Sequence, residues 1–437
     1  MAEEEILEEE QQPVDVEVEQ TTDVVEEEAP AEAEDFFSNL AEGLDERVLG
    51  SLASELISDY KKDKESRGDW EKSYTSGLDL LGFKYNDEGQ PFRGASSVTH
   101  PLLAEAVTQF QAQAYRELLP SDGPVKTMVV GDTSQPKQEQ AQRVKDFMNY
   151  MITEVMEEYT PEFDQMLFYL PLAGSAFKKI YFDNLLGRAV CKFVPAEDLV
   201  VPYYASDLKD CERITHVVKM SENDLLKKMT SGFYRDIKIF PSQTDDDEIQ
   251  DKYDEMEGVS STDKDYQHTI LEMHVDLDLD EYEVENAEKK VKIPYVISID
   301  EGSMEILSIY RNYMPDDPLF QRKEYFVHYK FLPGLGFYGF GLTHMIGGLS
   351  KSATAALRQL LDAGTLANLP AGFKSRSIRI RDDDQPFQPG EFRDVDAPGG
   401  NIKDQFQLLP FKEPSSVLMQ LLGFVVAAGQ RFAAIGD

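Results

Sequence analysis

The stretch Gly334-Leu-Gly-Phe-Tyr-Gly-Phe-Gly-Leu-Thr-His-Met-Ile-Gly-Gly-Leu349 decides the fold of this chain of 437 residues. It joins a glycine-rich turn to a long helix, which apolar periodicity predicts from Leu342 to Ala367. Residues 368–412 are irregular and rich in proline and glycine. Pro414 then opens a second long helix, since proline is favoured in a first helical turn. Two long helices on either side of a compact insert are expected to form an antiparallel pair.

The apolar surface of these two helices exceeds what a single partner helix can cover. The first helix contains small residues that permit close packing, including Gly347, Gly348 and Ala353. The second is apolar on nearly all sides between Val417 and Val426, and such a helix must be enclosed on all sides. We therefore expect neighbouring copies to complete the enclosure, because head-to-tail repetition of one unit can close into a ring. The residues predicted to pack between subunits are Leu349, Leu357, Leu360, Leu421, Phe424 and Val425.

The residues before the glycine-rich turn predict helices followed by a mostly antiparallel sheet, so the expected fold class is α+β. Apolar residues at helical spacing predict helices at 44–60, 101–119 and 138–159. The third helix has an apolar stripe that we expect to lie in the core: Val144, Phe147, Met148, Met151, Ile152, Val155 and Tyr159. Strands are predicted at 177–182, 188–194, 214–220, 269–279, 292–299, 306–313 and 325–331, with a helix at 222–229. The first two strands read as a hairpin, and the strand at 325–331 is expected to be the last of the sheet.

The charge of the chain limits the classes of function. The formal net charge is −39, and residues 1–35 contain 16 Asp/Glu and no Lys/Arg. These residues are expected to form a disordered acidic tail, and the acidic insert 241–264 is expected to be mobile. Tight nonspecific DNA binding depends on phosphate contacts, so the acidic balance argues against that class and suits a surface that nucleic acid passes without adhering. The only cysteines, Cys191 and Cys211, favour synthesis in a reducing compartment.

The sequence offers little for catalysis. The turn matches the dinucleotide-binding pattern GxGxxG at Gly334, Gly336 and Gly339, between a strand and a helix. Aromatic residues crowd this loop and hinder the close approach of a phosphate, so a flexible hinge is the simpler interpretation. We predict no catalytic residue, no cofactor and no metal. A nucleotide-dependent enzyme that uses Gly334–Gly339 stays open as the alternative.

A basic cluster interrupts the acidic sequence of the insert at 368–412. It lies on a predicted strand, Phe373–Arg381, and comprises Lys374, Arg376, Arg379 and Arg381. One interpretation is a solvated edge strand, where Lys and Arg discourage aggregation. The other is a contact with phosphate or with an acidic partner protein.

Five motifs within residues 50–437 carry a resemblance to a known family. They are Arg93-Gly-Ala-Ser-Ser-Val-Thr-His-Pro-Leu102, Ile309-Tyr-Arg-Asn-Tyr313, Tyr338-Gly-Phe-Gly-Leu-Thr-His-Met-Ile-Gly-Gly-Leu349, Leu360-Leu-Asp-Ala-Gly-Thr-Leu-Ala-Asn-Leu-Pro370 and Phe411-Lys-Glu-Pro-Ser-Ser416. As a set they resemble the portal proteins of tailed bacteriophages, in particular the short-tailed (podovirus) type. None of these motifs is catalytic.

The resemblance implies a wing domain at 36–333, a hinge and first stem helix at 334–367, a clip at 368–412 and a second stem helix at 413–437. In that family twelve subunits form a ring at one capsid vertex of the virion, assembled in the host cytoplasm and without a membrane. Double-stranded DNA passes through without sequence specificity during packaging and ejection.

Partners follow from the same resemblance. The clip docks the terminase large subunit and later the tail adaptor, or head-completion, proteins, and the ring also contacts the major capsid and scaffolding proteins. The basic cluster would then contact such partners. Family members continue past the second stem helix, so the chain is expected to be truncated at Asp437. A virion scaffold or adaptor protein without a channel is a further alternative.

Overall fold

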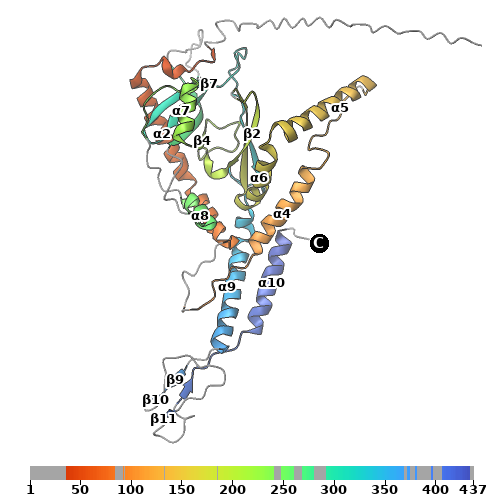
Figure 1. Ribbon diagram of the computed structural model, residues 1–437, viewed down its shortest axis with the longest axis vertical. Coiled ribbons are helices and arrows are strands. Elements are labelled where there is room, and N and C mark those ends of the chain that lie inside the picture. Colours follow the sequence, from red (N-terminus) through yellow and green to blue (C-terminus); the bar gives the residue numbers. More distant parts are fainter. Residues whose placement is uncertain are drawn as a thin grey trace, which may run out of the picture. The chain divides into compact units, whose positions relative to one another are not determined.

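The computed structural model describes most of the chain from residue 36 onward. The described residues are 36–83, 92, 94–131, 133–184, 186–240, 248–259, 268–279, 292–368, 372–374, 379–380, 395–396 and 406–433. The chain divides into two units, Met1–Ser38 and Asn39–Asp437, and the helices and strands labelled in Figure 1 lie in the second. The predicted disorder of residues 1–35 falls outside the described residues.

Helices begin the second unit and return at its end. They are α2 (Glu46–Ser66), α3 (Gly68–Leu78), α4 (Leu102–Leu118), α5 (Gln135–Tyr150), α6 (Tyr159–Ala173), α7 (Glu222–Thr230), α8 (Glu248–Glu257), α9 (Leu342–Asn368) and α10 (Ser416–Phe432). The helices predicted at 44–60, 101–119 and 222–229 are confirmed as α2, α4 and α7. The sequence pattern did not predict α3 as a separate helix.

The strands before α9 form two antiparallel sheets, where the sequence predicts one. The larger sheet has the order β3-β4-β5-β6-β7 and the smaller β2-β1-β8. Their bounds are β1 (Ser175–Asp183), β2 (Arg188–Pro195), β3 (Leu199–Val200), β4 (Arg213–Met220), β5 (His268–Leu277), β6 (Ile293–Asp300), β7 (Glu305–Arg311) and β8 (Phe326–Lys330). The predicted hairpin is confirmed, with Ile180 opposite Cys191. The strand predicted at 325–331 is confirmed as β8, but it pairs with β1 and does not continue the larger sheet after β7. Alternation identifies a strand but does not identify its partner.

The two sheets meet around Phe326 of β8. The His216 and His274 rings of the larger sheet lie 5.6 and 5.2 Å from the Phe326 ring. Beside them, Lys179 Nζ of β1 lies 2.6 Å from Glu272 Oε1 of β5, and His274 Nε2 lies 2.9 Å from the same oxygen. A largely buried ion pair therefore links the sheets.

The main core lies where helices pack beside the smaller sheet. Its fully buried members include Tyr74 of α3, Leu103 and Val107 of α4, Met166 and Leu167 of α6, Phe177 of β1 and Ile346 of α9. A second core lies under α7, where Leu225 and Met229 pack with Ile270 and Leu307 of the larger sheet. Both cysteines are buried and unpaired.

The helix predicted at 138–159 is interrupted. α5 ends at Tyr150, a π-helical turn, η3 (Met151–Val155), follows, and Met156 has non-helical dihedral angles before α6 begins. The prediction that its apolar stripe lies in the core is also wrong for α5, since no residue of α5 is buried and Phe147 is 62% exposed. Helical periodicity shows that residues share a face, but not that the same chain covers it.

The acidic insert, which the sequence predicts to be mobile, contains a packed helix. Helix α8 lies within 241–264, Ile249 is buried, and Tyr253 and Met256 pack against the main core. These three residues follow the i, i+4, i+7 spacing of a helical face. The many acidic residues around them obscured this signal. Residues 241–247 and 260–264 lie outside the described part of the chain.

Acid should weaken the link between the sheets. Burial alone raises the pKa of Glu272, but Lys179 and the hydrogen bond with His274 outweigh it and hold this pKa well below the ordinary value. A carboxylate whose pKa is lower in the folded state than in the unfolded state stabilises the fold at any pH above the unfolded-state pKa. This stability is lost as the pH falls through the folded-state pKa.

We therefore expect the free energy of unfolding to fall more steeply between about pH 5 and pH 3 for the native protein than for Glu272→Gln. Urea unfolding at each pH measures this slope. Glu65→Gln, which removes an exposed carboxylate of α2, is the control and should keep the native slope. If the free energy of unfolding of Glu272→Gln falls with pH as steeply as that of the native protein, the prediction is wrong.

Candidate functional site

The loop 334–341 fixes the start of α9 through close contact of two backbones. A Cβ atom added at Gly339 would lie 2.5 Å from Gly174 O. One added at Gly341 would lie 2.4 Å from Leu172 O. Only glycine fits at these two positions, because no side chain could be inserted without moving backbone. We call this contact of 339–341 with 172–174 the seat of α9.

Three backbone N–H groups of this loop, those of residues 339–341, are occupied by the chain itself. The bonds are Gly339 N to Ser175 Oγ (2.8 Å), Phe340 N to Leu332 O (2.8 Å) and Gly341 N to His344 Nδ1 (3.2 Å). A phosphate loop needs such groups to point at its ligand. Of the three glycines of the GxGxxG pattern, Gly339 is required for packing, whereas nothing lies within 4 Å of a Cβ atom added at Gly336. The end of the loop is packed against residues 172–174, and the prediction of a flexible hinge stays a prediction.

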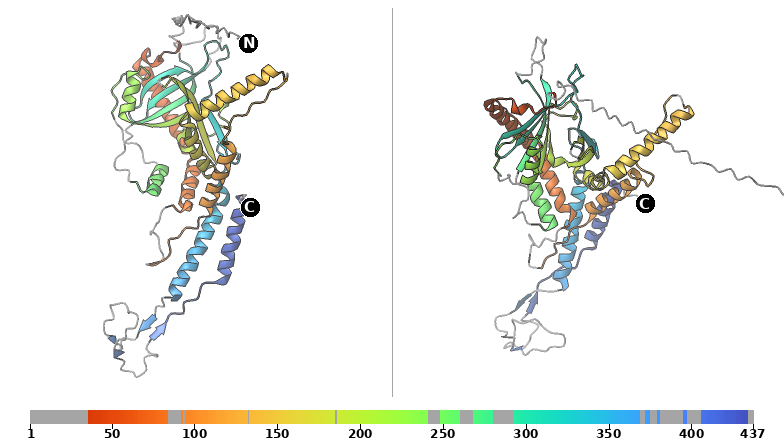
Figure 2. Two further views of the ribbon diagram at one scale, coloured as in Figure 1. Left: turned by 45° about the vertical axis from the view of Figure 1, so that its right-hand side comes forward. Right: turned by 45° about the horizontal axis from the view of Figure 1, so that its top comes forward.

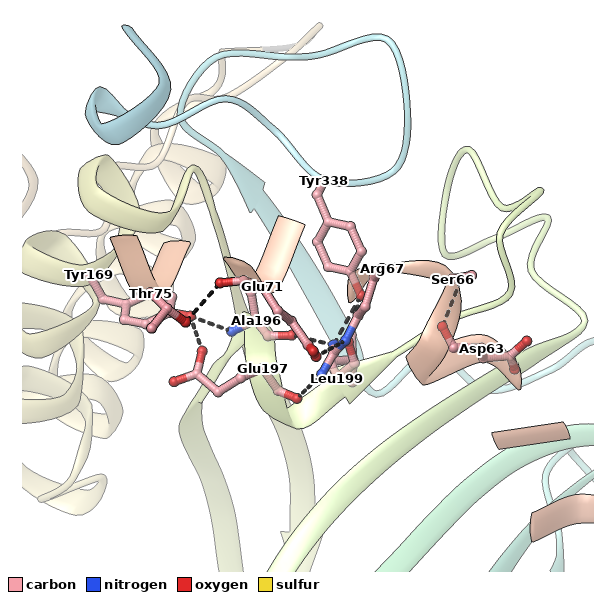
Figure 3. A network of polar contacts seen from close by, with 10 residues as sticks. All are labelled: Asp63, Ser66, Arg67, Glu71, Thr75, Tyr169, Ala196, Glu197, Leu199 and Tyr338. Carbon is pink, nitrogen blue, oxygen red and sulfur yellow. Dashed lines mark hydrogen bonds and ion pairs between the residues drawn. The ribbon is translucent and has the colours of Figure 1, made fainter. Parts of the chain in front are cut away.

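Arg67, between α2 and α3, ties this loop to the turn before β3. Its Nη1 donates to Ala196 O at 2.9 Å, to Leu199 O at 3.0 Å and to Tyr338 Oη at 3.1 Å (Figure 3). Its Nε lies 2.8 Å from Glu71 Oε1. The Arg67 side chain is only 5% exposed, so these partners replace its hydration. The planar fork of a guanidinium can serve several acceptors at once, which a lysine cannot.

A partly buried glutamate, Glu197, extends the network to two further helices. Tyr253 Oη of α8 donates to Glu197 Oε1 at 2.8 Å, and Tyr169 Oη of α6 donates to the other carboxylate oxygen (Figure 3 shows Tyr169 and Glu197). Burial raises the pKa of Glu197 although these hydrogen bonds and the Arg67 charge oppose it. The groups of this network bond to one another, and the arrangement joins α6 and α8 to the seat of α9.

An extended segment, Ser96–His100, runs along α9; we call it the strap. The bonds are Ser96 N to Asp362 Oδ1 (2.7 Å), Arg358 Nε to Val98 O (2.8 Å) and His100 N to Thr354 Oγ1 (3.0 Å). Two residues of extended chain rise about 6.6 Å and four residues of helix about 6.0 Å, so every second strap residue meets the next turn. The strap and α9 therefore run in opposite directions and stay in register.

Helices α9 and α10 lie side by side and antiparallel, as the sequence predicts (Figures 1 and 2). Pro414 lies 3.7 Å from the position of a Cβ atom on Gly364, so α10 starts beside the end of α9. The helix begins at Ser416, with Ser415 as its N-cap, and not at Pro414. Near its other end, the Leu102 side chain of α4 packs on Gly429.

The outer face of α10 is apolar and largely exposed. Its residues, which we call the α10 stripe, are Val417, Leu421, Phe424, Ala428 and Phe432, spaced by three or four positions. The exposed fractions are 72% for Val417, 52% for Leu421, 73% for Phe424 and 57% for Phe432. Of the other residues predicted to pack between subunits, Leu349, Leu357, Leu360 and Val425 are partly buried within their own chain.

The basic cluster lies only partly within the described residues. Lys374 ends β9 (Gly372–Lys374), which pairs with β12 (Phe406–Leu408). Arg379 begins β10 (Arg379–Ile380) and lies opposite Asp396 of β11 (Val395–Asp396). The two described parts of the predicted strand Phe373–Arg381 therefore pair with different strands, and residues 375–378 between them lie outside the described residues. Arg376 and Arg381 lie outside the described residues.

No family model matches this chain, and no curated protein matches it significantly. Among the residues that the structure describes, no group of three or more His, Cys, Asp or Glu is placed to hold a metal ion. In the same part of the chain, no helix combines the length and the apolar character needed to cross a membrane. Function is therefore inferred from α9, α10 and the seat that positions them.

Gly341→Ala should destabilise the protein, because the added Cβ atom would lie 2.4 Å from Leu172 O and 2.7 Å from Gly174 N. We expect the free energy of unfolding to fall by about 2 kcal/mol, the usual size for overpacking. Gly336→Ala is the matched control in the same loop, since nothing lies within 4 Å of its added Cβ atom. Urea unfolding compares the two variants. Equal losses would show that the seat does not depend on close backbone contact.

Proposed function

We propose that this chain is the subunit of a portal ring at one vertex of a tailed-bacteriophage capsid, through which double-stranded DNA enters and leaves. In this proposal the helices and sheets before residue 334 form the wing, α9 and α10 form the stem, and residues 368–412 form the clip. The portal-like motifs of the sequence support this assignment, and two of them, at 93–102 and 338–349, supply the strap and the seat.

The exposed α10 stripe is the observation that carries the proposal. One side of α10 packs on α9 and α4, while Phe424 on the other side is 73% exposed. Apolar area left in water costs about 25 cal/mol for each Å². Contiguous apolar surface of this kind marks an interaction site. Copies arranged side by side around an axis would cover the stripe of every subunit.

The distribution of charge supports the same arrangement. The chain carries a formal net charge of −39, so its copies repel one another over most of their surface. Helices α9 and α10 together contain three Lys/Arg and one Asp/Glu, so the stem lacks this acidic excess. Stems can therefore approach, while acidic surface elsewhere keeps passing DNA from adhering.

The clip is proposed as the docking element for the terminase large subunit during filling and for tail adaptor proteins afterwards. Its basic cluster, Lys374, Arg376, Arg379 and Arg381, would bind acidic surface on these partners. Arginine suits such a contact because its guanidinium binds carboxylates in a bidentate manner.

Phe424→Glu should weaken the assembly of copies. A carboxylate buried between stems without a partner is expected to weaken each contact by at least about tenfold, or about 1.4 kcal/mol. Native mass spectrometry and electron microscopy of the full chain should show closed rings for the native protein and mostly monomers for this variant.

The matched control is Met419→Glu, which adds the same charge to α10 on the side opposite the stripe and at a similarly exposed position, 69% against 73% for Phe424. It should assemble like the native protein. Circular dichroism should show both variants folded, since both side chains are mostly exposed. A native protein that stays monomeric at every concentration would overturn the proposed function.

A further inference from the structure

Helix α5 forms an arm that its own chain leaves uncovered. No residue of α5 is buried, and among the described elements its extensive contacts are with η3, its own continuation. Figures 1 and 2 show α5 extending away from the two sheets. The segment before it, 121–131, runs along α5 and is hydrogen-bonded to it. Val125 N donates to Asn149 Oδ1 at 2.9 Å, and Thr127 Oγ1 donates to Ala141 O at 3.1 Å. We call residues 121–150 the arm.

The arm presents large apolar side chains to solvent. On α5, the exposed fractions are 44% for Val144, 62% for Phe147, 44% for Met148 and 56% for Tyr150. On the segment 121–131 they are 84% for Met128 and 83% for Val130. A helix of 16 residues without tertiary packing is marginal in water, because packing of an apolar face supplies most helical stability. The arm therefore requires a surface that covers it.

The charge of the arm indicates which surface that is. Residues 121–150 contain four Lys/Arg and four Asp/Glu, so the arm is neutral within a chain of net charge −39. Two copies of so acidic a chain approach closely most easily where the excess of negative charge is missing. The stem is one such place and the arm is another. The arm is thus suited to lie against a second copy.

The small area of the stem contact also indicates a second contact between copies. Helix α10 has 17 residues. It is about 26 Å long, and one face about 10 Å wide offers roughly 260 Å². A specific interface buries about 800 Å² on each partner. A stem contact of this size needs a second contact between the same two copies.

We propose that the arm packs on a neighbouring copy of this chain, with Val144, Phe147 and Met148 in the interface. This inference rests on the proposed function, because it names a second contact within the same ring. Each subunit then offers two separate neutral and apolar surfaces, the α10 stripe and the arm, to its neighbours. Assembly from one copy to the next needs both.

Photo-crosslinking of the full-length protein tests this proposal directly. p-Benzoylphenylalanine is placed at Phe147 or, as the control, at Gln142, which is exposed on the opposite side of α5 from Val144. We expect crosslinks to a second copy from position 147, at least about fivefold more than from position 142, because crosslinking requires contact. Mass spectrometry of the crosslinked peptides identifies the partner.

Phe147→Glu and Gln142→Glu give an independent readout. Native mass spectrometry should show that Phe147→Glu weakens assembly by about tenfold or more, because a carboxylate replaces a covered ring. Gln142→Glu should assemble like the native protein. Intact rings in Phe147→Glu, with no crosslink between copies, would overturn the arm contact and leave the proposed ring standing. Crosslinks from position 147 to a different virion protein would also overturn it. A native protein that remains monomeric would overturn both proposals.

Discussion

The close approach of two backbones at the seat is the constraint on which the rest of the structure depends. Gly339 and Gly341 lie against residues 172–174 at distances that exclude any side chain, and this contact sets where α9 begins. Arg67 holds the same loop from the side of α2 and α3. Helix α10 is positioned mainly by its contact with α9. A displacement of this contact would therefore move both α9 and α10.

The elements that could be predicted from the sequence are those whose signals are local. The range of α9 follows from apolar periodicity after a glycine-rich turn, and the β1–β2 hairpin follows from alternation around a turn. The predictions that failed are those about which segments cover a helix and which strands pair. The stripe of α5 has the period of a core helix and is exposed, while α8 looks mobile and is packed. Periodicity describes one element, whereas burial depends on segments far away in the sequence.

In the candidate site, too, some residues could be predicted from the sequence and others could not. Leu421 and Phe424 could be found because an all-round apolar helix is visible in the sequence, and both are exposed. The Arg67 network could not be found, because most partners of the guanidinium are main-chain carbonyls more than a hundred positions away, such as those of Ala196 and Leu199. Carbonyl acceptors leave no mark in the residue types. The strap was visible as a motif, but its role follows from hydrogen bonds to α9.

Helix α9 has the geometry of a lever, because its buried residues extend only from Leu342 to Ala356 while the helix continues to Asn368. With 27 residues it is about 40 Å long, so a rotation of about 5° at the glycines would move its far end by roughly 3.5 Å. The short strands after α9 stand at the end of this lever. Slight repacking at the fulcrum is thereby magnified into a displacement as large as the spacing between neighbouring residues along the chain.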